Sequence, residues 1–225
     1  MRHFPAVFMV STCVAVFAQL ALAARANAQV QFPVGPPTPK VGDTVRYRTI
    51  DLWNNSELST EQSELVEIQA DRFTTRFKRS TESEARTRLF NREWQSCRPM
   101  YNSPELLCAG PLKFPLQAGA KHTYDKQPWT SGFGYDAATC EVKGEEKVTV
   151  AAGTFDAVRL DCTGFWNRVF NDQPRARDMT GKITFSVWYS PAISREIKSQ
   201  YASFNRSGSQ DIRSQTELLE FIPGK

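Results

Sequence analysis

The sequence predicts a mainly β protein, built as a single curved antiparallel sheet or an open half barrel with few helices. Three observations support this fold class. Apolar and polar residues alternate with period two along most of the chain after Gly42. Turn-forming residues recur at short intervals, and two cysteines bracket a segment, residues 140–162, that has the pattern of a hairpin. Roughly eight to eleven strands are expected.

Residues 1–28 have the pattern of a secretory signal peptide. Arg2 and His3 precede an apolar stretch over residues 4–24, and small residues frame a cleavage site between Ala28 and Gln29. A membrane anchor is the competing interpretation, but polar residues interrupt the stretch, and no later window approaches the ~20 apolar residues needed to cross a bilayer. We expect a soluble periplasmic or secreted protein, most simply of the Gram-negative envelope.

The mature chain is expected to hold one domain over residues 41–225, preceded by a tether over residues 29–40. Four prolines between Gln31 and Lys40 restrict the backbone to extended forms, which is typical of a linker outside the core. Loss of Arg2 and Arg25 with the signal peptide leaves 26 basic and 24 acidic side chains. This near balance does not indicate a nucleic acid partner.

The first half of the domain is assigned from alternation and turn residues, although residues 81–91 also suit a helix in part. Five prolines between Trp94 and Trp129 predict loops and short strands there. The expected elements are strand 45–51, a turn at 54–55, a hairpin of strands 65–69 and 73–78, strand 81–91, a turn at 116–119, strand 122–126 and a loop at 131–134.

Residues 140–162 predict two strands joined by a turn at 151–154, with both cysteines on the apolar face together with Val142, Val148 and Val150. If Val150 lay opposite Phe155, however, Cys162 would lie opposite Lys143 instead of Cys140. A bulge near Gly144 or a different turn must therefore absorb the offset.

The same alternation places Glu146 toward the core unless the bulge rotates the strand. An inward carboxylate should pair with a base such as Arg159 or Lys182. Further strands are expected over residues 183–189, 196–204 and 212–222, with a turn at Pro191.

Four cysteines remain after signal removal, an even number that suggests two disulfides in an exported chain. Of the three pairings, sequence proximity favours Cys97 with Cys108 and Cys140 with Cys162. A zinc site is the alternative, but the spacings include no Cys-x-x-Cys element and only one histidine, His122, remains. No metal or other cofactor is predicted.

Three stretches carry a resemblance to a known family: residues 41–47 (VGDTVRY), 148–158 (VTVAAGTFDAV) and 187–197 (VWYSPAISREI). In this order they resemble the TapB-like family of exported, mostly uncharacterised bacterial β proteins. The family usually has an aromatic residue where Val45 stands and a proline where Ala151 stands, so the chain resembles a divergent member. The resemblance implies a curved antiparallel sheet of the lipoprotein-carrier type and supplies no catalytic residues.

The sequence contains no catalytic constellation that can be read from spacing. His122 lacks a Gly-x-Ser-x-Gly partner motif, although an exported hydrolase that pairs it with a distant Ser, Asp or Cys is an alternative. Large aromatics near predicted turns can line a cleft for a lipid-like ligand or a peptide, or can fill the core. The candidate cleft residues are Trp53, Trp129, Phe133, Tyr135 and Trp188.

The leading functional hypothesis is non-catalytic binding of an apolar or amphipathic ligand, or of an envelope protein. A structural component of a larger envelope assembly is a third alternative, and an exposed sheet edge or a continuous apolar surface would support it. The identity of the ligand and the oligomeric state do not follow from the sequence.

Overall fold

The computed structural model describes residues 30–99, 104–129, 134–168 and 179–225. Within these ranges the protein contains twelve strands and no helix, and hence no helix that could cross a membrane. The strands are β1 (Thr44–Asp51), β2 (Glu57–Ile68), β3 (Arg72–Arg79), β4 (Arg86–Asn91), β5 (Ser96–Pro99), β6 (Leu106–Ala109), β7 (Lys121–Pro128), β8 (Gly134–Val150), β9 (Gly153–Arg168), β10 (Met179–Ser190), β11 (Arg195–Phe204) and β12 (Gln210–Ile222).

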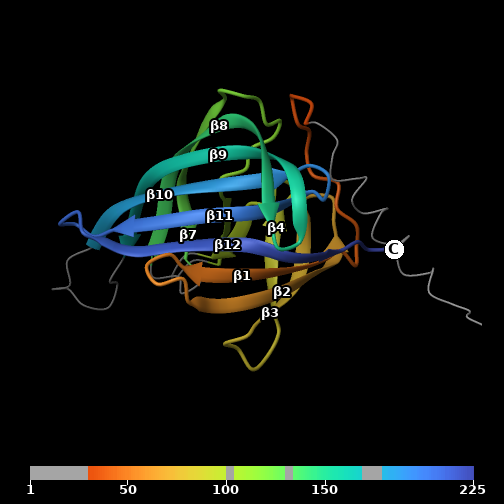
Figure 1. Cartoon of the computed structure of the whole chain (residues 1–225), viewed down its shortest axis with the longest axis horizontal. Helices are drawn as coiled ribbons and strands as arrows, with labels where there is room; N and C mark the ends of the chain where they lie inside the picture. The colour runs from red at the N-terminus through yellow and green to blue at the C-terminus, as the bar shows by residue number, and fades with distance from the viewer. Residues whose placement is uncertain (1–29, 100–103, 130–133, 169–178) are drawn as a thin grey trace, which may run out of the picture.

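All twelve strands form one antiparallel sheet in the order β6-β5-β4-β3-β2-β1-β12-β11-β10-β9-β8-β7. The first and last strands of the chain, β1 and β12, are neighbours in the middle of the sheet. The two edge strands, β6 and β7, pack beside each other, so the sheet curls into a nearly closed barrel (Figure 1). The prediction of a mainly β, curved antiparallel architecture is confirmed.

The twelve strands are one more than the upper limit of the eight to eleven that we expect from the sequence. The proline-rich section between Trp94 and Trp129 contributes three strands, β5, β6 and β7. Proline removes an amide donor from the ladder and is therefore tolerated at a strand end. Pro99 ends β5 and Pro128 ends β7, so both fit that rule.

The β8–β9 hairpin contains both the predicted bulge and a shorter turn than expected. Val150 lies opposite Gly153, so the turn has two central residues, Ala151 and Ala152, instead of four. The register then shifts by one residue between Val142 and Gly144, and Cys140 meets Cys162. Gly144 has φ of +131°, a conformation in which other side chains would be strained.

The bulge also corrects the assignment of faces in β8. Successive residues of a strand point to opposite faces, and Val148 lies opposite Phe155 whereas Cys140 lies opposite Cys162. Phe155 and Cys162 are an odd number of residues apart, so Val148 and Val150 lie on the face opposite to Cys140. They stay buried because the end of the hairpin packs in a core cluster of its own.

The core therefore has two main parts. One cluster fills the barrel interior, and its members are Val30, Val34, Leu112, Leu116, Val142, Val158, Leu160 and Tyr189. The other surrounds the tip of the β8–β9 hairpin, and its members are Val45, Val148, Val150, Phe155, Ala157, Trp188, Ile197 and Leu218. The amide of Ala152 in the hairpin turn donates to the carbonyl oxygen of Leu218 in β12 at 3.2 Å, which ties the tip to the sheet.

The proline-rich segment before β1 is not the free tether that its composition suggested. Val34 exchanges two backbone hydrogen bonds of 2.9 Å with Leu116, and Val30 and Val34 are buried in the interior cluster. The backbone amide of Val30 donates to Glu145 at 3.0 Å. We call residues 30–40 the strap. Its buried residues Val30, Val34 and Pro37 supply the apolar contact that holds it against the barrel.

Both expected disulfides are present, Cys97–Cys108 between β5 and β6 and Cys140–Cys162 between β8 and β9. Cys140 and Cys162 are almost completely buried, at 0% and 1% exposure. Each bond joins two residues that lie directly opposite each other on neighbouring strands. The disulfides therefore reinforce pairings that the strands already make.

Replacing both Cys140 and Cys162 with alanine should lower the free energy of unfolding by roughly 3 kcal/mol, since the 22-residue separation sets the loop entropy restored to the unfolded chain. The matched Cys97→Ala, Cys108→Ala variant removes a bond with a separation of only 11 residues and should lose slightly less stability. Denaturant unfolding of the oxidised proteins measures both. Equal stability of wild type and the first double variant contradicts the expectation.

Candidate ligand-binding cavity

A cavity of about 290 Å³ lies within the barrel, toward the end where β1 and β11 begin and β4 finishes. Strands that are far apart in sequence contribute its walls, and a segment between β6 and β7 completes them. The lining residues are Val45, Tyr47, Glu61, Ser63, Arg88, Phe90, Trp94, Ser96, Gly110, Pro111, Leu112, Gln127, Arg195, Glu196 and Thr216. The lining thus combines apolar and aromatic surface with charged groups.

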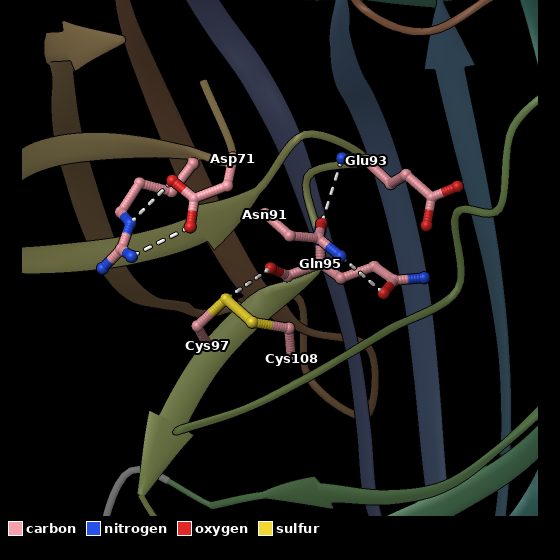
Figure 2. The surroundings of a disulfide bond; sticks show 7 residues. Asp71, Asn91, Glu93, Gln95, Cys97 and Cys108 are labelled. Carbon is pink, nitrogen blue, oxygen red and sulfur yellow. Dashed lines mark hydrogen bonds and ion pairs between the residues drawn. A yellow bond between two sulfur atoms is a disulfide. The ribbon is translucent and has the colours of Figure 1, made fainter. Parts of the chain in front are cut away.

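The tight turn between β4 and β5 positions Trp94. The side-chain oxygen of Asn91 accepts hydrogen bonds of 3.0 Å from the backbone amides of Glu93 and Gln95 (Figure 2). Trp94 itself adopts φ of +59°, in the left-handed region that a turn of this kind requires. The side-chain amide of Gln95 donates to the carbonyl oxygen of Leu112 at 2.6 Å, which fixes the turn against the opposite wall.

Trp94 is the centre of an aromatic group at one side of the cavity. Its ring centroid lies 4.5 Å from that of Phe73 and 5.3 Å from that of Phe90. The guanidinium carbon of Arg195 lies 3.5 Å from the centroid of the Trp94 ring. A guanidinium at this distance over an indole face forms a favourable cation–π contact.

Arg195 reaches this position from the turn between β10 and β11. Ser194, with φ of +54°, closes the turn, and its amide donates to Pro191 at 3.2 Å. Only 7% of Arg195 is exposed. Burial lowers the pKa of Arg195 to about 10, and the side chain therefore remains a cation at neutral pH.

Arg88, a second basic residue in the cavity lining, is paired with a carboxylate. Arg88 donates from both terminal nitrogens to the carboxylate of Glu61, at 3.0 and 3.1 Å. The same carboxylate accepts from Nε of Arg79 at 2.9 Å. One carboxylate thus serves two guanidinium groups, and both of its oxygens are occupied.

Glu196 borders the cavity beside Arg195 and keeps some accessible surface there, although protein surrounds it. Burial raises the pKa of Glu196 from 4.5 to about 7, and a hydrogen bond from Ser199 opposes the shift. The hydroxyl of Tyr47 donates to the backbone carbonyl of Glu196 at 2.6 Å. Burial also raises the pKa of Tyr47, so this hydroxyl stays a donor at neutral pH.

Of the five aromatics predicted as a cleft, the four that the structure describes do not meet at one site. Trp53 is 60% exposed at the turn after β1, and Trp188 is buried in the cluster around the hairpin tip. Trp129 donates to Asp136 at 2.9 Å, and the hydroxyl of Tyr135 accepts from Asn167 at 2.9 Å. Phe133 lies outside the described residues, as do Ala28 and Gln29. None of the four placed aromatics lines the cavity.

Because of the bulge, Glu146 lies on the face of β8 opposite to Cys140. Its carboxylate pairs with Arg159 at 3.1 Å and accepts from the indole nitrogen of Trp188 at 2.8 Å. One of the two bases suggested from the sequence is therefore its partner. The group stabilises the outer surface of β8, β9 and β10.

His122, the candidate base of the alternative hydrolase, lies on β7 and is not itself a lining residue of the cavity. Its Nε2 is 3.4 Å from the carbonyl oxygen of Gly110, and burial lowers the pKa of the ring. Among the described residues its hydrogen bonding does not involve a Ser or Cys side chain. Those residues also hold no group of three His, Cys, Asp or Glu side chains arranged for a metal ion.

Sequence reasoning missed Trp94, Arg195 and Glu196 as site residues. One signal was available: Arg195 and Glu196 are adjacent charges at the start of a predicted strand, between Ile193 and Ile197. Because adjacent strand residues point to opposite faces, one of the two charges had to point inward. In the structure both residues line the cavity.

Comparison with known proteins identifies a shared fold but does not identify a family. No protein-family model matches the chain, and no curated protein matches it. A solved structure of a candidate exported protein with a YmcC-like fold from Bacteroides fragilis superposes with a TM-score of 0.50 and 11% identity, over 84% of this chain and 99% of that one. A candidate lipoprotein from Parabacteroides distasonis gives 0.50 and 13%, over 85% and 100%. The chain shares their β fold.

Replacing Glu196 with glutamine should make the protein more stable than wild type at pH 8 and not at pH 4. A carboxyl whose pKa is about 7 in the folded state and 4.5 when unfolded stabilises the fold at low pH, and this contribution is lost as the pH rises from 4.5 to 7. The difference should reach the order of 3 kcal/mol. Urea unfolding across this range measures it, and a constant difference between the two proteins refutes it.

Proposed function

We propose that this is an exported, non-catalytic protein whose barrel cavity binds a small amphipathic molecule. The observation that carries the proposal is the composition of the cavity lining. Phe90, Leu112 and Val45 supply apolar surface, while Arg195 and Glu196 supply charge at the same site. Ligand pockets typically combine a largely apolar wall with a few polar groups that orient the ligand.

The size of the cavity agrees with a small ligand. Its volume of about 290 Å³ is at the lower end of the ~300–1,000 Å³ usual for small-molecule sites. A whole lipid with two long acyl chains would not fit in this space. A molecule with one short chain and one polar head group would.

Export is supported by the signal-like residues 1–28 and by the two disulfides. The periplasm of a Gram-negative cell is the compartment we propose. We also propose that the chain is a divergent TapB-like protein, since each of the three stretches that carry the resemblance lies at the start of a strand or at a turn between two strands. They begin β1, form the β8–β9 turn and form the β10–β11 turn.

Ser63→Leu should abolish binding of a short amphiphile. Ser63 lines the cavity on β2 and is 7% exposed, so a leucine there occupies part of the cavity volume. Isothermal titration of the purified protein with octanol and with octanoate is the measurement. We expect binding of at least one of them by the wild type and a loss of at least about tenfold, or about 1.4 kcal/mol, in the variant.

Gln62→Leu is the matched control, because the neighbouring side chain is exposed on the outer face of the same strand. It adds a leucine without filling the cavity and should leave affinity unchanged. Organic extracts of protein purified from its native cells, analysed by mass spectrometry, should contain a stoichiometric amphiphile. If neither alcohol nor carboxylate binds and the extracts are empty, the proposed function is wrong.

A further inference from the structure

Three side chains that line the cavity have hydrogen-bond donors with no partner among the described residues. They are Arg195, at both Nε and Nη2, Trp94, at the indole nitrogen, and Ser96, at the hydroxyl. Buried polar groups nearly always find a partner, and each exception costs on the order of 1–3 kcal/mol. Three exceptions in the lining of one cavity indicate that the partner is a molecule from outside the chain.

Arg195 differs in this respect from the other guanidinium groups of the interior. Arg88 and Arg79 share the carboxylate of Glu61, whereas Arg195 has no ion pair within the part of the chain that the structure describes. The nearby carboxylate of Asp43 is already used by the backbone amides of Lys40 and Gly224, at 2.7 and 2.8 Å. A buried, unpaired cation is among the most costly groups that a fold can retain.

We propose that the ligand carries an anionic head group, a carboxylate or a phosphate monoester, which binds to Arg195. Nε and Nη2 form one edge of the guanidinium, and this edge holds two oxygens of such an anion through parallel hydrogen bonds. Trp94 covers the face of the guanidinium and not this edge. The indole of Trp94 and the hydroxyl of Ser96 add further donors, which an anion also accepts.

The charge around the cavity also favours an anion over a cation. Arg79, Arg88 and Arg195 have three nearby carboxylates, those of Glu61, Glu196 and Asp43. Burial raises the pKa of Glu196 to about 7, so this carboxyl is partly uncharged at neutral pH, and the two oxygens of Asp43 accept from backbone amides. An ammonium head group would add a second cation beside Arg195, whereas a carboxylate would pair with it.

The unpaired donor atoms have almost no exposed surface. The head group must therefore displace neighbouring atoms to reach them, and the indole nitrogen of Trp94, which lies against the guanidinium, is itself one of the unpaired donors that it should bind. The indole should then pass from an unpaired to a hydrogen-bonded state. Binding of an anionic amphiphile should accordingly change tryptophan fluorescence, and this change should be absent in Trp94→Phe.

This inference rests on the proposed function, and its test separates the two. The purified protein is titrated by calorimetry with octanoate, octyl phosphate, octanol, octylammonium and inorganic phosphate. We expect at least one of the anionic amphiphiles to bind about tenfold or more tightly than octanol, and octylammonium to bind most weakly. Arg195→Met should remove the preference for the anions, so that octanoate and octyl phosphate bind to the variant no more tightly than octanol does.

Arg46→Met is the control, because Arg46 is a half-exposed guanidinium outside the cavity that pairs with Glu220 at 3.8 Å. It should keep the wild-type preference. If Arg195→Met does not fold, Trp94→Phe decides: loss of the indole donor should lower the ratio of anion affinity to octanol affinity several-fold. This variant keeps a ring to pack against Phe73 and Phe90.

Equal affinity for octanol and both anions, or tightest binding of octylammonium, overturns the inference and leaves the proposed function standing. Binding of inorganic phosphate that depends on Arg195, without any binding of octanol, supports the anion site and rejects the amphipathic ligand. Failure of all five compounds to bind overturns both.

Discussion

The register of β8 against β9 is the constraint on which the rest of the structure depends. A one-residue slip in a strand exchanges its two faces. The Cys140–Cys162 bond and the bulge before Gly144 place Leu160 and Val142 inside the barrel while Glu146 meets Arg159 outside. The pairing continues through β10 and β11, and the β10–β11 turn delivers Arg195 to the interior. The position of Arg195 therefore depends on the register of β8 against β9, in another part of the sheet.

The barrel keeps this cation at a cost in stability. Apolar residues of similar volume in place of an unpaired buried charge often raise stability. Retention of Arg195 is therefore better explained by a ligand than by the needs of the fold, and a bound anion would stabilise the folded state by an amount that grows with the logarithm of its concentration divided by its dissociation constant. The aromatic group of Phe73, Phe90 and Trp94 limits the cost, because a cation–π contact replaces part of the lost hydration.

Much of the fold could be predicted from the sequence, because alternation and turn residues are local signals. They indicated the strands that became β1, β3, β9 and β11, the two disulfides and the bulge near Gly144. The cavity could not be predicted, since its walls come from β1, β2, β4, β5, β11 and β12 and only the closing of the sheet brings them together. The exposed Trp53 and the core residue Trp188 show that aromatic content alone does not locate a site.

Docking of the strap depends on parts of the chain that are synthesised after it. The amide of Val30 donates to Glu145, and Val34 is paired with Leu116, so residues near the start of the chain dock on segments that are made much later. The predicted cleavage after Ala28 lies two residues before Val30. A peptidase needs extended chain on both sides of the bond that it cuts. If the leader is cut at this bond, we expect the cut to precede docking of the strap against Leu116 and Glu145.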